Sequence, residues 1–281
     1  MYPYLIRIGG LSLPAYPLFC GLGIAIAGTV AMWLGRRDGI DPRKMAHLML
    51  LTGALMLVGG RLFYVVQDAA YFQGHLLEAI DLSAGGQVLY GGLVLASIGI
   101  LVFARAAHMR LGPMLDAVSV GAPLGLVFGR IGCFCRGCCH GRLTDLPWGV
   151  TFPPHVDLQG RLVGSEAFMR HVEAGLILPS AQYSAPVHPS QLYSAAASLM
   201  VFAIMLWLWR SRRLSGRLVF VYVWLYCAVR FGLELTRDNK MAFGCLTVPQ
   251  VVSPIVFAVA MSAFLLLRGW RRHARVCLQS A

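Results

Sequence analysis

The sequence predicts an all-α integral membrane protein with about seven transmembrane helices. Of its 281 residues, 58% are hydrophobic and 13% are charged, and the mean hydropathy is +0.67. Soluble domains rarely have this composition, because they need more charged surface in contact with water. Long apolar stretches and basic clusters on alternate loops predict the same class.

Seven apolar stretches are long enough, at about 17 to 25 residues, to cross about 30 Å of hydrocarbon. They cover residues 16–34, 46–66, 88–104, 113–134, 190–209, 218–236 and 248–267. The segment before the first stretch lacks a basic cluster and a small-residue cleavage site, so we expect that stretch to remain as a transmembrane helix. We expect residues 1–281 to form a single polytopic membrane domain.

Basic residues gather after the first, third, fifth and seventh stretches. Fourteen of the 24 Lys and Arg residues lie there: Arg36, Arg37, Arg43, Lys44, Arg105, Arg110, Arg210, Arg212, Arg213, Arg217, Arg268, Arg271, Arg272 and Arg275. The positive-inside rule assigns these loops to the cytoplasm, so we expect a periplasmic amino terminus and a cytoplasmic carboxyl terminus. Residues 141–187, between the fourth and fifth stretches, would then form a small periplasmic head. The basic residues do not interleave with aromatic residues, which argues against nucleic-acid binding.

Polar residues within or beside the stretches all fall in the outer half of the membrane in this topology. They are Tyr16, Arg61, Tyr90, Arg130, His188, Gln191, Tyr193, Arg230, Glu234 and Arg237. A charged side chain at the bilayer centre costs about 2.5–3.5 kcal/mol, and less near the interface. Since Glu234 cannot neutralise all of these arginines, the pattern predicts an anionic ligand.

Structural explanations for these residues stay open. Tyrosines at span ends are typical interfacial anchors. His188 precedes Pro189 and is equally suited to the start of a helix. Arg230, Glu234 and Arg237 share one helix face and can form an ion-pair ladder.

An anion among apolar helices in the outer leaflet is most simply a phospholipid head group. The planar fork of a guanidinium suits phosphate better than an ammonium does. Nearby glycines would let the backbone approach such a ligand, or would serve helix packing instead. They are Gly91, Gly92, Gly129, Gly132, Gly137 and Gly141. The residues alone therefore predict a lipid-phosphate site.

Five motifs occur in an order and spacing that resemble one family. They are GGR at 59–61, YGG at 90–92, GRIGCFCRGCCHGR at 129–142, HPSQLY at 188–193 and the set Arg230, Glu234 and Arg237. Over essentially the whole chain, the sequence resembles the bacterial prolipoprotein diacylglyceryl transferase family. The resemblance implies a multi-pass enzyme of the inner (plasma) membrane. Such an enzyme moves the diacylglyceryl group of phosphatidylglycerol onto the lipobox cysteine of a preprolipoprotein signal peptide, forming a thioether.

The resemblance also implies roles for individual residues. The expected catalytic residues are Arg130, Arg230, Tyr90, Tyr16 and His188. The expected substrate-binding residues are Arg130, Arg61, Gly91, Gly92, Cys133, Gly137, Cys138, Gly141, Arg142, Gln191, Tyr193, Glu234 and Arg237. No cofactor and no metal are expected. The implied partners are phosphatidylglycerol, the preprolipoprotein and the surrounding membrane lipids, with no nucleic acid.

Four positions depart from the family pattern. Tyr90 stands where the family usually has histidine, and Cys133 stands where it has asparagine. Cys138 replaces a common glutamate, and Ser194 replaces the acidic residue that often follows HPSQLY. An unperturbed tyrosine, with a pKa of about 10, is a poor base at neutral pH. We therefore expect a histidine (His140 or His188) or the positive field of the arginines to help form the attacking thiolate.

Five cysteines lie toward the periplasmic side in the expected topology: Cys133, Cys135, Cys138, Cys139 and Cys245. An oxidising compartment favours a disulfide, and Cys138 or Cys139 pairing with Cys245 is one option. Because the number of these cysteines is odd, at least one thiol should stay free or pair elsewhere. Adjacent thiols rarely all reach one tetrahedral ion without flanking loop freedom, so zinc is not favoured. The C-x-x-C pair at 135–138 lacks the βαβ context of a redox motif.

Three other functions stay open. The first is a related transferase that uses a different thiol or alcohol acceptor. The second is a membrane thiol-disulfide oxidoreductase that uses Cys135 and Cys138, which predicts no dependence on Arg130. The third is a non-catalytic lipid-binding protein, which predicts retained lipid without product.

Overall fold

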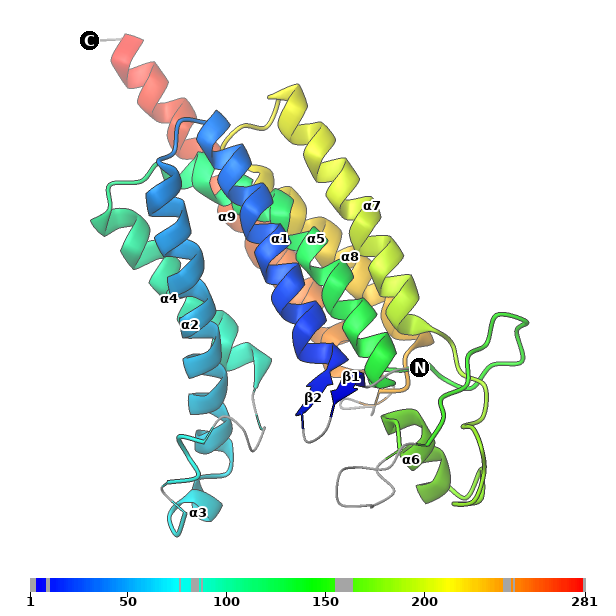
Figure 1. Cartoon of the computed structure of the whole chain (residues 1–281). Helices are drawn as coiled ribbons and strands as arrows, with labels where there is room; N and C mark the ends of the chain where they lie inside the picture. Colours follow the sequence, from blue (N-terminus) through cyan, green and yellow to red (C-terminus); the bar gives the residue numbers. More distant parts are fainter. Residues whose placement is uncertain are drawn as a thin grey trace. The chain divides into compact units, whose positions relative to one another are not determined.

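The computed structural model describes residues 4–8, 11–75, 77–81, 86, 88–154, 164–239, 244 and 246–279. Its elements are β1 (Tyr4–Ile8), β2 (Leu11–Pro14), α1 (Ala15–Arg37), α2 (Pro42–Gln67), α3 (Ala69–Phe72), α4 (Leu89–Ala106), α5 (Leu111–Arg136), α6 (Glu166–Glu173), α7 (Ser190–Ser211), α8 (Leu218–Leu233), η1 (Glu234–Thr236) and α9 (Val248–Gln279). Helices dominate (Figure 1), and β1 and β2 pair as a short antiparallel hairpin. The all-α fold class is confirmed.

Six helices in the described part of the chain are long and apolar enough to cross a membrane, and Tyr90–Ala106 is a shorter apolar helix. These seven helices match the seven expected stretches, with α8 and η1 together forming the sixth. The expectation of about seven transmembrane helices is therefore confirmed. The side of the membrane on which each end lies stays a prediction.

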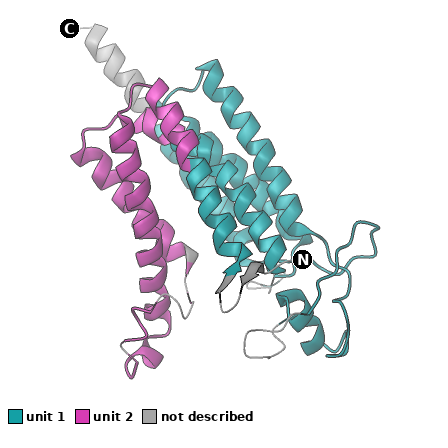
Figure 2. Ribbon diagram, in the orientation of Figure 1, with its two compact units in different colours: residues 1–27, 118–281 teal, residues 28–117 magenta. Residues whose placement is uncertain are grey.

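The chain divides into two compact units, coloured in Figure 2. Unit 1 comprises residues 1–27 and 118–281, and unit 2 comprises residues 28–117. Unit 1 contains most of the candidate site residues. Unit 2 contains Arg61, Tyr90, Gly91 and Gly92. That the whole chain acts as a single domain stays a prediction.

In unit 2, α2 and α4 pack along each other (Figure 1). A Cβ on Gly91 would lie 2.5 Å from the Gly59 carbonyl oxygen, and a Cβ on Gly92 would lie 2.6 Å from the Met56 carbonyl oxygen. Side-chain carbons do not approach backbone so closely, so these glycines let the two helices touch. Gly59, Gly91 and Gly92 therefore serve the packing of α2 against α4.

In unit 1, the first half of α1 packs against the second half of α5 in the same way. A Cβ on Gly23 would lie 2.7 Å from the Gly125 carbonyl oxygen, and a Cβ on Gly132 would lie 3.3 Å from the Tyr16 carbonyl oxygen. Helix α8 in turn contacts α7 and α9. This packing brings the start of α1 next to the end of α5, where the cysteine-rich motif begins.

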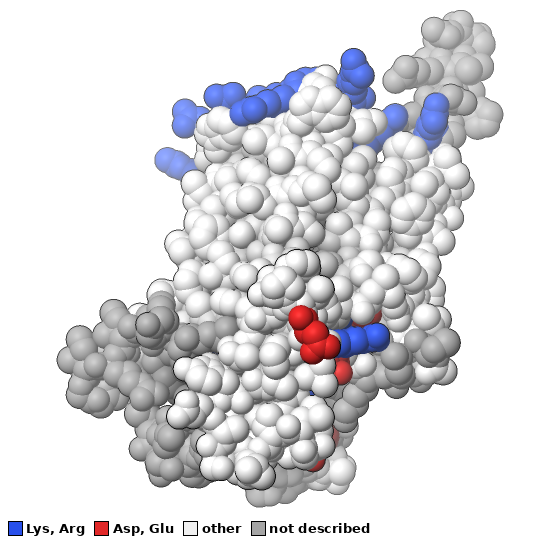
Figure 3. All heavy atoms as spheres, turned by 90° about the vertical axis from the view of Figure 1, so that its right-hand side faces the viewer, with Lys and Arg blue, Asp and Glu red and all other residues white. Residues whose placement is uncertain are grey.

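The two ends of the unit 1 helices differ in charge. The end of α7 and the turn to α8 carry Arg210, Arg212, Arg213 and Arg217. Figure 3 shows Lys and Arg side chains gathered mainly at one end, with Asp and Glu toward the other. The segment that joins α5 to α7 lies at the opposite end of α7 from the arginine-rich turn. The arrangement is the one that the positive-inside rule leads us to expect.

The segment between α5 and α7 forms a small folded head. Phe152, Ala167 and Val187 are fully buried in its core and pack against Phe134 and Val150. Val150 and Val187 exchange two backbone hydrogen bonds of 3.0 Å. Because Phe134 belongs to the last turn of α5, this core attaches the head to the end of that helix.

Candidate active site

The turn after α5 has a tightly defined backbone. Gly137 ends the helix with a φ of 74°, and a Cβ there would lie 2.5 Å from the Cβ of Ser165, so glycine is required. The Cys138 amide then donates to the Cys133 carbonyl at 3.1 Å. Cys139 also has a positive φ, of 58°. The chain therefore reverses direction and returns past the end of α5.

The first turn of α7 holds this cysteine turn from the other side. The Ser190 hydroxyl donates to the Cys139 carbonyl at 2.9 Å, and the Gln191 side-chain amide donates to the Cys138 carbonyl at 2.8 Å. Both side chains are buried. The HPSQLY motif thus positions the cysteine turn, and a direct contact of Gln191 with substrate stays a prediction.

Gly141 and Arg142 tie together three segments of unit 1. The Gly141 amide donates to the His188 carbonyl at 3.0 Å, and the Arg142 amide donates to the Thr236 carbonyl at 2.9 Å. The His188 amide returns a bond to the Arg142 carbonyl, also at 2.9 Å. The Arg142 Nε donates to the Arg237 carbonyl at 3.1 Å. This junction, residues 141, 142, 188 and 236, joins the ends of α5, α7 and α8.

A pocket lies between α5, α7 and α8. It is lined by Pro123, Leu126, Arg130, Ser194, Ser198, Val201, Tyr222, Tyr226, Val229, Arg230 and Leu233. Leucine, valine and proline side chains form one part of the lining, serine and tyrosine side chains form another, and Arg130 and Arg230 supply positive charge. The pocket therefore combines an anion-binding pair with a wall that suits hydrocarbon.

Positive charge exceeds negative charge beside this pocket. The Arg230 Nη1 donates to the fully buried Glu234 carboxylate at 2.5 Å. Arg130 and Arg237 both lie within electrostatic reach of Arg230. Among the described residues, Arg130 has no hydrogen-bond or ion-pair partner, and the buried Nε of Arg237 has none either. Since one carboxylate faces three guanidinium groups, an anion is the ligand that would complete the site.

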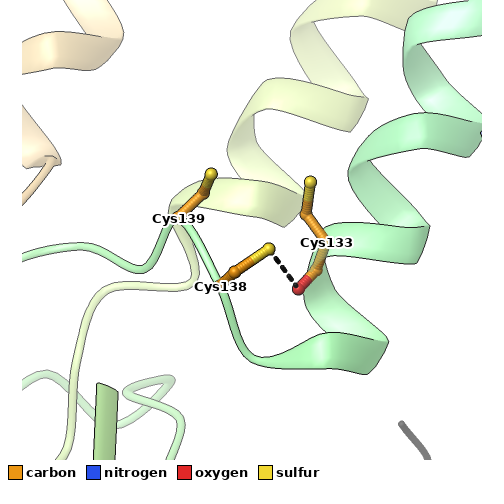
Figure 4. A group of neighbouring side chains, drawn as sticks. All are labelled: Cys133, Cys138 and Cys139. Atoms are coloured by element: carbon orange, nitrogen blue, oxygen red, sulfur yellow. Dashed lines mark hydrogen bonds between the residues drawn. The ribbon is translucent and has the colours of Figure 1, made fainter. Parts of the chain in front are cut away.

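The sulfur atoms of Cys133, Cys138 and Cys139 all lie within 4.8 Å of one another (Figure 4). Arg130 and Arg237 lie within electrostatic reach of Cys139. Hydrogen bonds from the Cys133 and Cys138 thiols, together with the charges of Arg237 and Arg130, hold the pKa of Cys139 well below its usual range. Hydrogen bonds with Cys133 and Cys139, together with burial, raise the pKa of Cys138. The positive charges of the two arginines thus favour a thiolate within this group.

This convergence differs from the expectation that adjacent thiols would not gather around one point. The positive φ angles of Gly137 and Cys139 provide the reversal that an ordinary loop lacks. Cys135 is not part of the group. Cys245 lies outside the described residues, so its expected disulfide with Cys138 or Cys139 stays a prediction.

Aromatic candidates lie at the rim of the same region. The Tyr193 hydroxyl accepts a bond from the Trp148 indole at 2.7 Å and lies 3.4 Å from the His188 Nδ1. The Tyr16 ring centre lies 5.7 Å from the guanidinium carbon of Arg136. Tyr16 is also within electrostatic reach of the Cys133 and Cys138 thiols. Unit 1 thus brings the candidates from α1, α5, α7 and α8 together.

The candidates in unit 2 have separate surroundings. The buried Arg61 donates to the Ala79 carbonyl at 2.9 Å, to the Gly86 carbonyl at 3.1 Å and to the Glu78 carbonyl. These bonds favour a structural role for Arg61, although its expected role in substrate binding is untested. Tyr90 is about half exposed, and its expected catalytic role likewise stays a prediction.

The structure adds pocket residues that were not among the expected site residues, although Ser194 was noted as a departure from the family pattern. Ser194 and Ser198 of α7, together with Tyr222 and Tyr226 of α8, line the pocket. Each pair has i, i+4 spacing within an otherwise apolar helix, which places both members on one face. That spacing is a signal that could have identified the pocket wall from the sequence.

The family model described as prolipoprotein diacylglyceryl transferase matches residues 3–266. The chain belongs to the prolipoprotein diacylglyceryl transferase family. A relative from Nitratidesulfovibrio vulgaris is 31% identical over 280 residues, which cover 95% of this chain and 94% of the relative. Relatives from Corynebacterium efficiens and Finegoldia magna are 29% and 26% identical over 92% and 88% of this chain, and over 79% and 88% of their own length.

Each of these relatives is named phosphatidylglycerol–prolipoprotein diacylglyceryl transferase. Membership of the prolipoprotein diacylglyceryl transferase family makes the chain a transferase and a multi-pass membrane protein. The match spans both compact units, so the resemblance does not depend on the cysteine-rich turn alone.

Proposed function

We propose that the chain transfers the diacylglyceryl group of phosphatidylglycerol to the lipobox cysteine of a preprolipoprotein signal peptide, in the bacterial inner membrane. The observation that carries this proposal is the pocket between α5, α7 and α8. Arg130 and Arg230 supply paired donors for a phosphate, and the leucine and valine side chains beside them suit acyl chains.

The reaction replaces a carbon–oxygen bond with a carbon–sulfur bond. The acceptor thiolate attacks the diacylglycerol carbon that carries the phosphate, and the electron pair of the broken bond leaves with the phosphate oxygen. Glycerol phosphate departs, and the proton of the acceptor thiol passes to a base. The leaving group changes from a singly charged diester to a monoester with up to about two charges. Arg130 and Arg230 would stabilise that growing charge in the transition state.

Complementation tests the function directly. The chain should restore growth and lipoprotein maturation to a bacterium depleted of its own diacylglyceryl transferase. Mass spectrometry of a reporter lipoprotein should show the added diacylglyceryl group on the lipobox cysteine. Full expression in the membrane without any modified lipoprotein would contradict the proposal and would favour another acceptor or a lipid-binding role.

Replacing Arg130 tests the site. Because lysine keeps the charge but loses the planar pair of donors, Arg130→Lys and Arg130→Gln should both reduce transfer about 10²- to 10³-fold. The measurement is product formed per folded protein in isolated membranes. Arg105→Gln, at the end of α4, is the control and should keep normal turnover. Normal turnover by Arg130→Gln would remove Arg130 from the site, and a matching loss of folded protein would indicate a structural arginine.

A further inference from the structure

Three thiols from one short segment meet at a common point in unit 1. The sulfur atoms of Cys133, Cys138 and Cys139 all lie within 4.8 Å of one another. Three sulfurs that bind one ion at about 2.3 Å lie about 4 Å apart. The observed cluster therefore needs a closing movement of less than about 1 Å to surround a metal ion.

Backbone turns and hydrogen bonds from α7 fix the arrangement of the chain around the cluster. The reversal at Gly137 and Cys139 uses positive φ angles. The buried side chains of Ser190 and Gln191 donate to the carbonyls of Cys139 and Cys138. These restraints hold two adjacent cysteines beside Cys133, where the Cys138 thiol donates to the Cys133 carbonyl at 3.7 Å (Figure 4). Such preorganisation lowers the entropy cost of binding.

The surrounding charge suits a thiolate-bound metal. Three thiolates around a divalent ion leave one net negative charge. The guanidinium groups of Arg130 and Arg237 lie within electrostatic reach of Cys139, and the buried Nε of Arg237 has no hydrogen-bond partner among the described residues. The arginines can therefore offset the charge of the loaded site.

We propose that Cys133, Cys138 and Cys139 form a binding site for a thiophilic closed-shell cation, with Zn²⁺ as its natural occupant. The three thiolate sulfurs are the protein ligands, and a fourth coordination position stays open for water or another donor. Binding of one Zn²⁺ releases the thiol protons that the ligands still carry, so the reaction involves no change of redox state. The site does not depend on the function proposed above.

Metal binding to the full-length protein in detergent, after reduction and removal of the reductant, tests this site. Zn²⁺ alone should bind with a stoichiometry of one ion per chain. X-ray absorption at the zinc edge should show a shell of three sulfur atoms at about 2.3 Å. Cd²⁺ alone should produce the ultraviolet charge-transfer band of cadmium–thiolate bonds. A zinc shell of nitrogen and oxygen atoms only, in the unaltered protein, would overturn the proposal without reference to any variant.

Single serine variants locate the ligands. Cys133→Ser, Cys138→Ser and Cys139→Ser should each weaken Zn²⁺ binding by more than about 100-fold, since loss of an outer partner of a ligand already costs about 10- to 100-fold. Cys135→Ser is the matched control in the same segment and should bind Zn²⁺ normally, because Cys135 is not part of the group. Equal binding by all four variants would refute the assignment.

Alkylation in native membranes distinguishes a metal from a disulfide. If Zn²⁺ occupies the site in the cell, the three thiols should resist alkylation until a chelator is added. If they resist until a reductant is added, and a chelator has no effect, the cluster is a disulfide site and the metal proposal is wrong.

Discussion

Replacing Gly141 with alanine tests whether the junction of residues 141, 142, 188 and 236 positions the site. An added Cβ would lie 2.5 Å from the His188 Cβ and 2.6 Å from the carbonyl oxygens of His188 and Thr236. The two oxygens belong to the backbone, so no side-chain rotation relieves the clash. They would have to retreat by about 0.8 Å to reach an ordinary contact. That movement would stretch the hydrogen bonds that join Gly141 to His188 and Arg142 to Thr236.

We expect Gly141→Ala to lower transfer about 100-fold, because a misplacement of about 1 Å in a positioning element can cost that much. Overpacking should also cost about 1–3 kcal/mol of folding free energy. Gly21→Ala is the control. Beyond the neighbouring backbone of α1 itself, no described atom lies within 4 Å of the added Cβ at this position, so alanine should keep full activity and stabilise the helix by up to about 1 kcal/mol.

The assay measures transfer from phosphatidylglycerol to a fluorescent lipobox peptide in detergent, at equal concentrations of folded protein. Thermal unfolding is followed on the same samples. If Gly141→Ala matched the unaltered protein in both turnover and unfolding temperature, the steric reasoning would be refuted. A lower unfolding temperature with unchanged turnover per folded molecule would refute only the positioning role.

Two further predictions concern stability. Glu234→Gln should destabilise the protein by about 3–5 kcal/mol, because it leaves Arg230 without its buried partner. Arg170→Gln is the control, since it breaks only exposed ion pairs, and it should cost about 0–1 kcal/mol in the same thermal unfolding assay. Burial, reinforced by the nearby His140 and opposed by Asp238, lowers the pKa of His171 from 6.5. As pH falls, the unfolded state takes up the imidazole proton before the folded state does. Stability should therefore fall as pH drops through 6.5 and level off below the lowered pKa. The unfolding temperature of His171→Gln should lack this part of the pH dependence.

The membrane fold was predictable because its signals are local. An apolar stretch of about 20 residues must be a helix in hydrocarbon, since every backbone polar group needs a partner within the segment. The helix positions could therefore be read from composition alone. Arg130 and Arg230 could be predicted as candidate site residues for a related reason, since a charge in an apolar helix needs an explanation.

The roles of the glycines were not predictable from composition. Gly91 and Gly92 let α4 touch α2, and Gly141 closes a backbone junction. A glycine in a sequence offers the same close approach to a ligand, a helix or a turn. The choice among these depends on what the rest of the chain places within a few ångströms, which local patterns do not contain.

The cysteines show most clearly what local sequence patterns could not decide. Their number and spacing indicated a disulfide, a metal ion or a redox pair without separating them, because each chemistry needs a distance between sulfur atoms. The tertiary structure brings Cys133, Cys138 and Cys139 together and leaves Cys135 out of the group. Two positive φ angles and two hydrogen bonds from α7 produce that selection. The sequence by itself determined the class of protein and the charges inside it, since these follow from transfer to hydrocarbon. The packing of distant segments decided which of those side chains meet.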